Sequence, residues 1–336
     1  MTKKTTIVLS CVITALCILP LLLSSFYLSI ATEILILGIF ALSLNILLGY
    51  TGLVSLGHAA FFGVGAYTAG LVGKNISEHL LVTLIASLVV SIIVSFIVGY
   101  FCTRASGFYF LMLTLAFSQM IYSAFHQWRF AGGSNGLSGI PKPALTSTFN
   151  FSQSIYLYFL ILIIFLVVIY AVNRFIKSPL GHVLIGIREN ETRMKAMGYN
   201  TKFYSQLAFV LAGGLGGIAG CLYSYFNGFV SPNDLYWTMS GQVLIMVLVG
   251  GAGTILGPIL GAGFIVFLET IISSYTELWM LIIGTVFILF VIFAPKGIVG
   301  LAQSVKKKLV NRTEVEIIEQ IEVSTNTGNE ETKSVI

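Results

Sequence analysis

Long apolar runs constrain this chain more than any other feature of its sequence. The clearest cover residues 7–23, 80–100, 155–172 and 278–294. At about 1.5 Å per residue, a helix over each of them comes close to the roughly 30 Å of hydrocarbon in a bilayer. The runs show no polar alternation, and backbone groups in lipid must be satisfied within a helix or a closed barrel. The sequence therefore predicts an all-α, polytopic membrane protein.

Composition supports this class and argues against a cleaved leader. Hydrophobic residues make up 57% of the chain and charged residues only 9%, whereas soluble domains carry about 25% charged residues. Lys3 and Lys4 precede an apolar stretch, as in a secretory signal, but that stretch continues past Pro20 to Ile30 without a small-x-small cleavage site. It predicts a retained first span. The cysteines lie in apolar stretches without metal-ligand spacing and are interpreted as small buried hydrophobes: Cys11, Cys17, Cys102 and Cys221.

Ten apolar segments are candidates for membrane spans. They cover residues 7–30, 34–48, 53–73, 80–102, 107–125, 155–173, 203–230, 239–250, 254–272 and 278–294. The third is rich in glycine and the eighth is short, so either could be re-entrant. The prediction is therefore about 8–10 transmembrane helices.

The basic residues predict the orientation. With the N-terminus in the cytoplasm, all but Lys74, Arg129 and Lys142 of the 18 Lys and Arg residues fall inside. The positive-inside rule then places both termini and the 174–202 loop in the cytoplasm. Residues 1–302 are predicted to form the membrane domain and residues 303–336 a polar, disordered tail. The basic run 306–312 could bind anionic lipid, although an orientation signal is the simpler interpretation.

The long polar interior segment, 174–202, predicts a cytoplasmic helix. Ser178 before Pro179 is typical of an N-cap, and Gly198 of a C-terminal stop. Apolar residues recur between them at close to helical spacing, and charged residues form the other face. The apolar positions are Leu184, Ile187, Met194 and Met197; the polar ones are Arg188, Glu189, Arg193 and Lys195. Such a helix either docks a soluble partner or rests on the membrane surface.

The glycine-rich segment 49–70 is too rich in small residues for a lipid-facing helix. Its sequence is GYTGLVSLGHAAFFGVGAYTAG. Small residues let helices approach closely, and interruptions at glycine free backbone groups that can line a solute path. Polar side chains at membrane depth usually face the protein interior or a water-filled cavity. Close packing alone explains any one glycine as well as a path does.

Several motifs in this order resemble the branched-chain amino acid ABC transporter permeases of the LivM type. Besides the 49–70 segment they are GGSNGLSGIP at 132–141, SPLG at 178–181 running on to Gly198, LVGGAGTILGP at 248–258 and APKGIVGL at 294–301. The resemblance covers roughly residues 30–302. Urea and short-chain amide permeases look similar over the same segments.

The resemblance implies a bacterial cytoplasmic-membrane importer with two ABC ATPase subunits, a second permease subunit and an extracytoplasmic binding protein. Branched-chain amino acids are the favoured cargo, with urea or amides second. Candidate residues for the translocation path are Asn45, Thr51, Ser55, His58, Phe62 and Tyr67. Candidates for coupling to the ATPase are Leu184, Ile187, Arg188, Glu189, Glu191, Met194 and Gly198. Importers usually carry Glu-Ala-Ala before a glycine here, whereas this chain has Glu191-Thr192-Arg193.

The sequence contains no Gly-x-x-x-x-Gly-Lys-Ser/Thr loop, so this chain is not expected to bind ATP. No cofactor or nucleic-acid partner is predicted, and a membrane-embedded enzyme is disfavoured because no acid, base and nucleophile cluster emerges. The histidines are too scattered to suggest a metal site. The main alternative is a proton-coupled carrier. Such a carrier needs a carboxylate at depth, and the candidates are Glu33, Glu269 and Glu277, with Glu269 the deepest.

Overall fold

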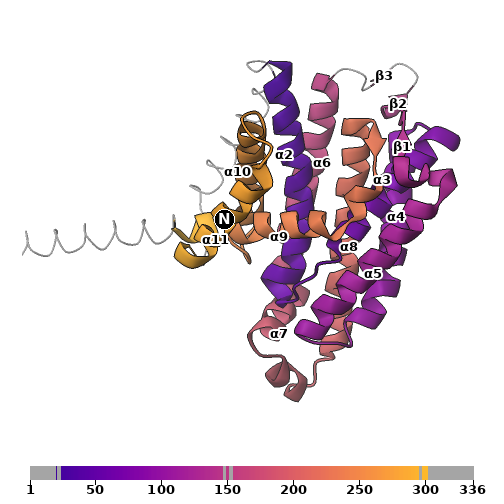
Figure 1. The fold of residues 1–336 in the computed structure, drawn as a ribbon. Coiled ribbons are helices and arrows are strands. Elements are labelled where there is room, and N and C mark those ends of the chain that lie inside the picture. Colours follow the sequence, from indigo (N-terminus) through magenta and orange to yellow (C-terminus); the bar gives the residue numbers. More distant parts are fainter. Residues whose placement is uncertain (1–19, 21–23, 147–148, 151–153, 295–296, 302–336) are drawn as a thin grey trace, which may run out of the picture.

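The computed structural model describes residue 20 and residues 24–146, 149–150, 154–294 and 297–301. Helices dominate these residues (Figure 1). The long helices are α2 (Ser25–Asn45), α3 (His58–Asn75), α4 (Leu80–Cys102), α5 (Phe108–Gln127), α6 (Ser154–Ile176), α7 (Pro179–Ala196), α8 (Thr201–Asn227), α9 (Trp237–Gly250), α10 (Leu256–Ser273) and α11 (Trp279–Phe293). The all-α class is confirmed.

Helix α4 shows that the bundle is built for lipid. Its small polar residues are all buried and form one stripe: Thr83, Ser87, Ser91 and Ser95. The opposite face exposes large apolar side chains, among them Leu81, Ile85, Val89 and Phe96. A soluble helix would place these faces the other way round. Six helices in the described residues are long and apolar enough to cross a membrane: α2 with its continuation to Thr51, α4, α5, α6, α8 and α10.

The centre of the bundle is the contact of α3 with α8, which α4 covers from one side. A Cβ on Gly65 would overlap the backbone of Gly217, so the two helices meet at their backbones. Serines of α4 then bond to carbonyls that this approach exposes: Ser87 Oγ donates to Gly65 O at 3.0 Å and Ser91 Oγ to Phe61 O at 3.4 Å. The buried hydroxyls of Ser87 and Ser91 are therefore paired with backbone.

Helices α2, α9 and α10 pack beside this centre. Figure 1 shows α9 running crosswise to the upright α2 and α6. At 14 residues, α9 is about 21 Å long and too short to cross the hydrocarbon alone. The eighth predicted segment is thus a helix inside the bundle, as the re-entrant alternative allowed.

Short strands and 3-10 turns cap the end of the bundle opposite α7. Strand β1 (Leu137–Ser138) pairs antiparallel with β4 (Phe229–Val230), with Leu137 opposite Val230. Strand β2 (Ala144–Thr146) pairs antiparallel with β3 (Phe149–Asn150). The 3-10 turns are η2 (Arg129–Ala131), η3 (Gly133–Asn135) and η4 (Pro232–Leu235). The β1–β4 pair ties the chain before α6 to the chain after α8.

The structure corrects two predicted boundaries. The segments 7–30 and 34–48 were expected to be separate, but one helix runs from Ser25 to Asn45, because residues 30–34 contain no glycine or proline, and Thr32 Oγ1 donates to Leu28 O within the helix. The third segment was expected to begin at 53, but residues 52–57 are non-helical and α3 begins at His58. The rest of the predicted first span and the predicted tail, 303–336, lie outside the described residues.

Candidate coupling site and translocation path

The candidate coupling site begins where α2 loses its regular hydrogen bonding. After Asn45 the helix widens into a π-helical turn, Ile46–Thr51, and the chain then leaves the helix at Gly52, whose φ is +75°. Leu53 N donates to Leu47 O at 3.1 Å and closes the turn. Such π turns often mark functional sites in helices. The break leaves backbone groups near Gly49 for other elements to satisfy.

Asn45 joins this break to the turn between α9 and α10. Its Nδ2 donates to Thr254 O at 2.8 Å, and its Oδ1 accepts from Gly253 N at 2.9 Å. The side chain is fully buried. A Cβ on Gly49 would overlap the Asn45 amide and the backbone of Gly253, so only glycine fits between the two breaks.

Arg188 of α7 reaches the same point. Its Nη1 donates to Gly49 O, and its side chain lies against the position that a Cβ of Gly52 or Gly253 would occupy. A charge-assisted bond to a backbone carbonyl is stronger than a neutral one. One side chain of the predicted coupling helix therefore contacts both broken segments of the membrane domain.

Helix α7 has the predicted ends but not the predicted continuity. Ser178 Oγ accepts from Gly181 N at 3.4 Å, Pro179 follows it, and Gly198 has φ +88° just beyond the helix, so the start and stop signals are confirmed. Asn190, however, has φ −160° and ψ +97°, and its Oδ1 accepts from Arg193 N at 2.9 Å. An asparagine that caps a new turn has split the helix into two short pieces.

The apolar stripe of α7 faces this chain rather than a partner. Leu184, Ile187 and Met194 are buried by their own chain. Met194 Sδ packs over Gly186, which folds the second piece of α7 back on the first. The expectation that these side chains fill a groove on another protein does not fit this placement. The large apolar residues left exposed between the start of α7 and the start of α8 include Leu180, Met197, Tyr199 and Phe203.

The acidic coupling candidates differ from each other. Glu191 Oε1 accepts from Thr201 Oγ1 at 3.0 Å and lies 2.8 Å from Lys195 Nζ, so it ties the second piece of α7 to the start of α8. The hydrogen bond from Lys195 lowers the pKa of Glu191, and the Thr201 hydroxyl lowers it further. Glu189 is exposed and free to meet another subunit.

The path candidates are all buried within this chain: Asn45, Thr51, Ser55, His58, Phe62 and Tyr67. Thr51 and Ser55 serve the local break, since Thr51 Oγ1 donates to Leu47 O and Ser55 Oγ accepts from Gly57 N at 3.3 Å. The structure brings Asn45 together with Arg188 through Gly49. It does not gather the candidates around an open channel in the described part of the single chain.

His58, at the start of α3, is linked to α2. Its Nε2 lies 2.7 Å from Ser43 Oγ, and that hydroxyl lies 2.6 Å from Phe40 O, to which it donates. The only donor left for the first contact is the imidazole N–H, so Nε2 carries the proton and Nδ1 is an acceptor. Nδ1 has no hydrogen-bond partner among the described residues.

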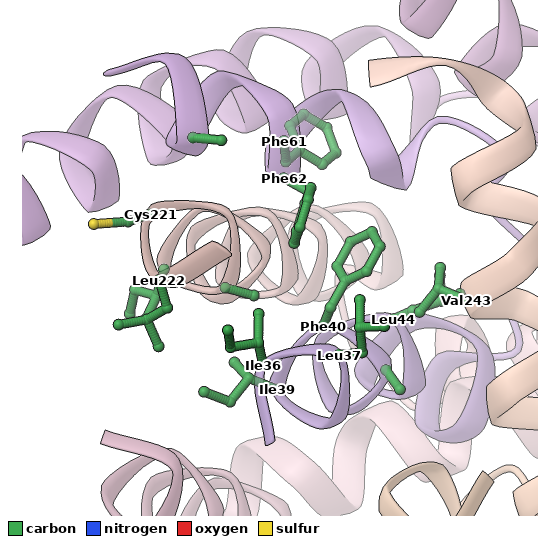
Figure 2. Packing of buried hydrophobic residues seen from close by; sticks show 14 of the residues in the cluster. Ile36, Leu37, Ile39, Phe40, Leu44, Phe61, Phe62, Cys221, Leu222 and Val243 are labelled. Carbon is green, nitrogen blue, oxygen red and sulfur yellow. The ribbon is translucent and has the colours of Figure 1, made fainter. Parts of the chain in front are cut away.

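Phe62 and Tyr67 belong to the core rather than to an open gate. Figure 2 shows Phe62 and Phe40 turned toward each other between the helices, and their ring centroids are 4.5 Å apart. Phe62 also lies 5.1 Å from the Tyr223 ring, and Tyr67 lies 4.7 Å from Phe125. A gate made by these rings would need movement of α3 against α2 or α8.

Sequence reasoning missed several residues that hold this site together. Ser43 orients His58, and Ser240 Oγ accepts from Ala59 N at 2.8 Å at the start of α3. Neither has a local sequence signal, because their partners are distant in the chain. The serines of α4 do have one: Ser87, Ser91 and Ser95 recur every fourth residue, which predicts one polar stripe on a helix.

Comparisons with known proteins agree with this arrangement. The family described as "Branched-chain amino acid transport system / permease component" matches residues 26–291. The chain is 28% identical over 308 residues to the high-affinity branched-chain amino acid transport system permease protein LivM of Salmonella typhimurium, covering 84% of this chain and 72% of that protein. LivM of Escherichia coli is also 28% identical, with the same coverage.

A more distant relative is the probable branched-chain amino acid transport permease protein LivM of Methanocaldococcus jannaschii. It is 25% identical over 198 residues, covering 52% of this chain and 56% of that protein. No solved structure gives a significant match. The family match spans the broken helix α2, helix α7 and the α9–α10 turn that Asn45 and Arg188 join. The chain belongs to the family of permease components of branched-chain amino acid transport systems.

Proposed function

We propose that this chain is the membrane-spanning permease subunit of an ATP-driven importer of branched-chain amino acids. It works with a second permease subunit, two ABC ATPase subunits and an extracytoplasmic binding protein, in the bacterial cytoplasmic membrane with both termini in the cytoplasm. ATP hydrolysis belongs to the partner subunits. The observation that carries this proposal is the bond from Arg188 to Gly49 O, because it connects a helix at one end of the bundle to the break in a membrane helix.

Helix α7 is suited to transmit a push from an ATPase. Leu184 and Ile187, on its first piece, are buried within the chain, so a force on the outer face of this piece is passed to the residues that pack against it. Arg188 then displaces the α2 break, and Asn45 carries the displacement to the α9–α10 turn. Coupling through contacts with two arrangements is the physical form that such transmission takes. The buried path candidates line the moving joint in this scheme.

The docking face for the ATPase is proposed on the exposed side of α7 and the start of α8. Met197 is 65% exposed and Phe203 59% exposed, and Glu189 lies on the same cytoplasmic end. A hollow of about 540 Å³ adjoins the start of α7 and is rimmed by Arg174 and Lys177. Exposed apolar anchors with charges at the rim are typical of a protein interface.

The test is reconstitution of the complete transporter in proteoliposomes. Leucine uptake should require ATP and the loaded binding protein, and the isolated chain should transport nothing. The double substitution Met197→Asp and Phe203→Asp should abolish co-purification of the ATPase and stimulated hydrolysis. Ile76→Asp, an exposed apolar residue at the opposite end of the bundle, is the matched control. Normal coupling in the double variant would show that α7 only rests on the membrane surface.

The alternative cargo is urea or a short-chain amide, and it enters the same experiment. Uptake of urea rather than leucine, under the same requirement for ATP and a binding protein, would support the proposed ATP-driven importer and change only its substrate. Gradient-driven uptake without ATPase subunits would instead identify a proton-coupled carrier.

A further inference from the structure

The outward-facing stripe of α6 ends in two cations. Ile163 and Val167 are 61% exposed and Tyr170 is 69% exposed, on a helix that is long and apolar enough to cross a membrane. Arg174 and Lys177 continue the same spacing of three and four residues and are exposed as well. Lys177 N still makes the hydrogen bond of an α-helix, so this spacing keeps them on one face. The face therefore passes from apolar residues that meet lipid to positive charge at the membrane surface.

The hollow at the start of α7 lies where this stripe changes character. Its volume is about 540 Å³, within the range of about 300–1,000 Å³ that is usual for ligand sites. Its apolar wall and its cations come mainly from α6: Val167, Tyr170, Ala171, Arg174 and Lys177. Met197 and Phe203 do not line it, so the hollow is separate from those two anchors of the proposed docking face.

The positive charge at the hollow is not balanced by the chain. In the part of the chain that the structure describes, the side chains of Arg174 and Lys177 have no ion-pair or hydrogen-bond partner. The Ser178 hydroxyl, also in the wall, is already used, because it donates to Phe175 O at 2.6 Å and accepts from Gly181 N at 3.4 Å. The two cations are therefore the groups that remain to bind an anion.

An orientation signal alone would also place cations at the end of a membrane helix. Arg174 in the last turn of α6 further suits the negative end of the helix dipole. Neither explanation calls for a hollow beside the cations or for an apolar wall that continues from it along the exposed face. Basic pockets of this kind beside membrane helices bind anionic lipid headgroups. The hollow is thus the feature that separates a binding site from a signal.

We propose that this hollow binds an anionic phospholipid, with Arg174 and Lys177 on the phosphate of its headgroup. A guanidinium can hold two phosphate oxygens at once, and the lysine adds a second positive charge. The acyl chain follows the apolar stripe of Val167 and Tyr170 into the membrane. Ser178 caps α7 directly after these cations, so the bound lipid holds the base of the coupling helix at the membrane surface. That role, unlike the binding itself, rests on the proposed function.

Lipid binding to the full-length chain in neutral detergent tests the site, with native mass spectrometry as the readout. The wild type should bind phosphatidylglycerol in preference to phosphatidylcholine. Ala171→Trp keeps both cations but fills the hollow, and it should weaken phosphatidylglycerol binding by about tenfold or more, because the phosphate can no longer reach two cations together. Ala116→Trp, at an exposed alanine of α5, is the control. Unchanged binding in Ala171→Trp would overturn the site, since the cations would then attract lipid without the hollow.

A charge variant tests the headgroup contacts in the same measurement. Arg174→Gln with Lys177→Gln should remove the preference for phosphatidylglycerol. Arg193→Gln with Lys202→Gln removes the same charge from exposed positions that do not line the hollow, and it should keep the preference. Equal loss in both double variants would assign the preference to net charge and overturn the site. Displacement of the lipid by glycerol 3-phosphate would show that the hollow takes a soluble phosphate instead.

Transport by the complete transporter tests the role at the base of α7. In proteoliposomes of phosphatidylcholine, added phosphatidylglycerol should raise ATP-driven leucine uptake by the wild type and by Ala116→Trp, but not by Ala171→Trp. An equal rise in all three would overturn this role.

The outcomes separate the two proposals. Selective binding of phosphatidylglycerol by a wild-type transporter that takes up no amino acid contradicts the proposed function and keeps the lipid site. ATP-driven leucine uptake by a chain that binds both lipids equally keeps the function and removes the site.

Discussion

The α3–α4–α8 block and the α2–α9–α10 region are built on opposite principles. In the block, continuous helices meet at their backbones, and the serines of α4 bond to the exposed carbonyls. In the other region the helices are interrupted, at Ile46–Gly52 and at Gly251–Ile255, and side chains from elsewhere bond to the backbone at these breaks. Helices α9 and α10 also meet at their backbones, since a Cβ on Gly261 would overlap Met246 O, so the two regions differ in the continuity of their helices rather than in the closeness of their packing.

This difference shows where a permease can move. Close backbone contact leaves no room for sliding, because packed interiors deform in steps rather than continuously. Broken helices joined by Asn45 and Arg188 can shift once those bonds rearrange. The coupling helix contacts the broken region through Arg188, so we expect motion driven from α7 to enter α2, α9 and α10 while the block stays fixed.

The largest expected effect is on the rigid block. A Cβ on Gly220 would overlap Phe62 O, so Gly220→Ala forces α8 away from α3 and should cost about 1–3 kcal/mol or more. The measurement is the thermal midpoint of the purified protein in detergent. Gly241→Ala is the control, since a Cβ there meets nothing within 4 Å and alanine favours helix. Equal midpoints for the two variants would contradict a close backbone contact between α8 and α3 at Gly220.

The next effect concerns the joint between the breaks. Asn45→Leu leaves Gly253 N and Thr254 O buried without their partner and should cost about 1–3 kcal/mol of stability. Asn45→Asp keeps the acceptor but turns a carboxylate oxygen toward Thr254 O, so at neutral pH it should cost at least as much as Asn45→Leu. Uptake should fall with stability in both. Asn75→Leu, at an exposed asparagine, is the control and should be neutral.

Arg188→Ala should uncouple the transporter while leaving it folded. The lost charge-assisted bond to Gly49 O is worth about 1.5–3 kcal/mol, and it acts between α7 and the break rather than within the block. Stimulated hydrolysis and leucine uptake should fall together, with the thermal midpoint of the block little changed. Arg193→Ala removes a charge from the exposed side of α7 and serves as control. Unchanged uptake in Arg188→Ala would exclude this bond as the link.

The smallest effect is at Glu191. Its pKa is lowered from 4.5 by the hydrogen bond from Lys195, so its contribution to stability is present above the unfolded pKa and is lost as pH falls through the lower folded value. The pair is about half exposed, which limits the contribution to about 0.5 kcal/mol. Hydrogen exchange over 191–201 should quicken in Glu191→Gln at pH 7, and the difference should vanish in acid. A difference that persists below pH 3 would assign the effect to packing.

Local signals predicted much of the fold. The long apolar runs predicted the membrane helices. The Ser178-Pro179 pair and Gly198 predicted the two ends of α7. The split at Asn190 was missed because an asparagine inside an amphipathic pattern carries no strong stop signal. The burial of Leu184, Ile187 and Met194 was also missed. An apolar stripe indicates that a helix packs against another surface. It does not indicate whether that surface belongs to the same chain or to a partner.

The candidate site was predicted in its residues but not in its connections. Asn45, Arg188 and the 248–258 motif were each singled out, yet the bonds that unite them join residues more than a hundred positions apart. Ser43 and Ser240 were missed because their partners, His58 and the backbone of Ala59, lie on another helix.

The sequence by itself determined that this protein lies in a membrane, that its fold is all-α and which family it belongs to. Hydrophobicity, caps and glycine-rich motifs carry this information because they act through neighbours in the chain. Which face of α7 is free and which breaks share one arginine were decided by the tertiary structure alone. Those properties depend on distances between segments, and a linear pattern leaves such distances undetermined until the helices pack.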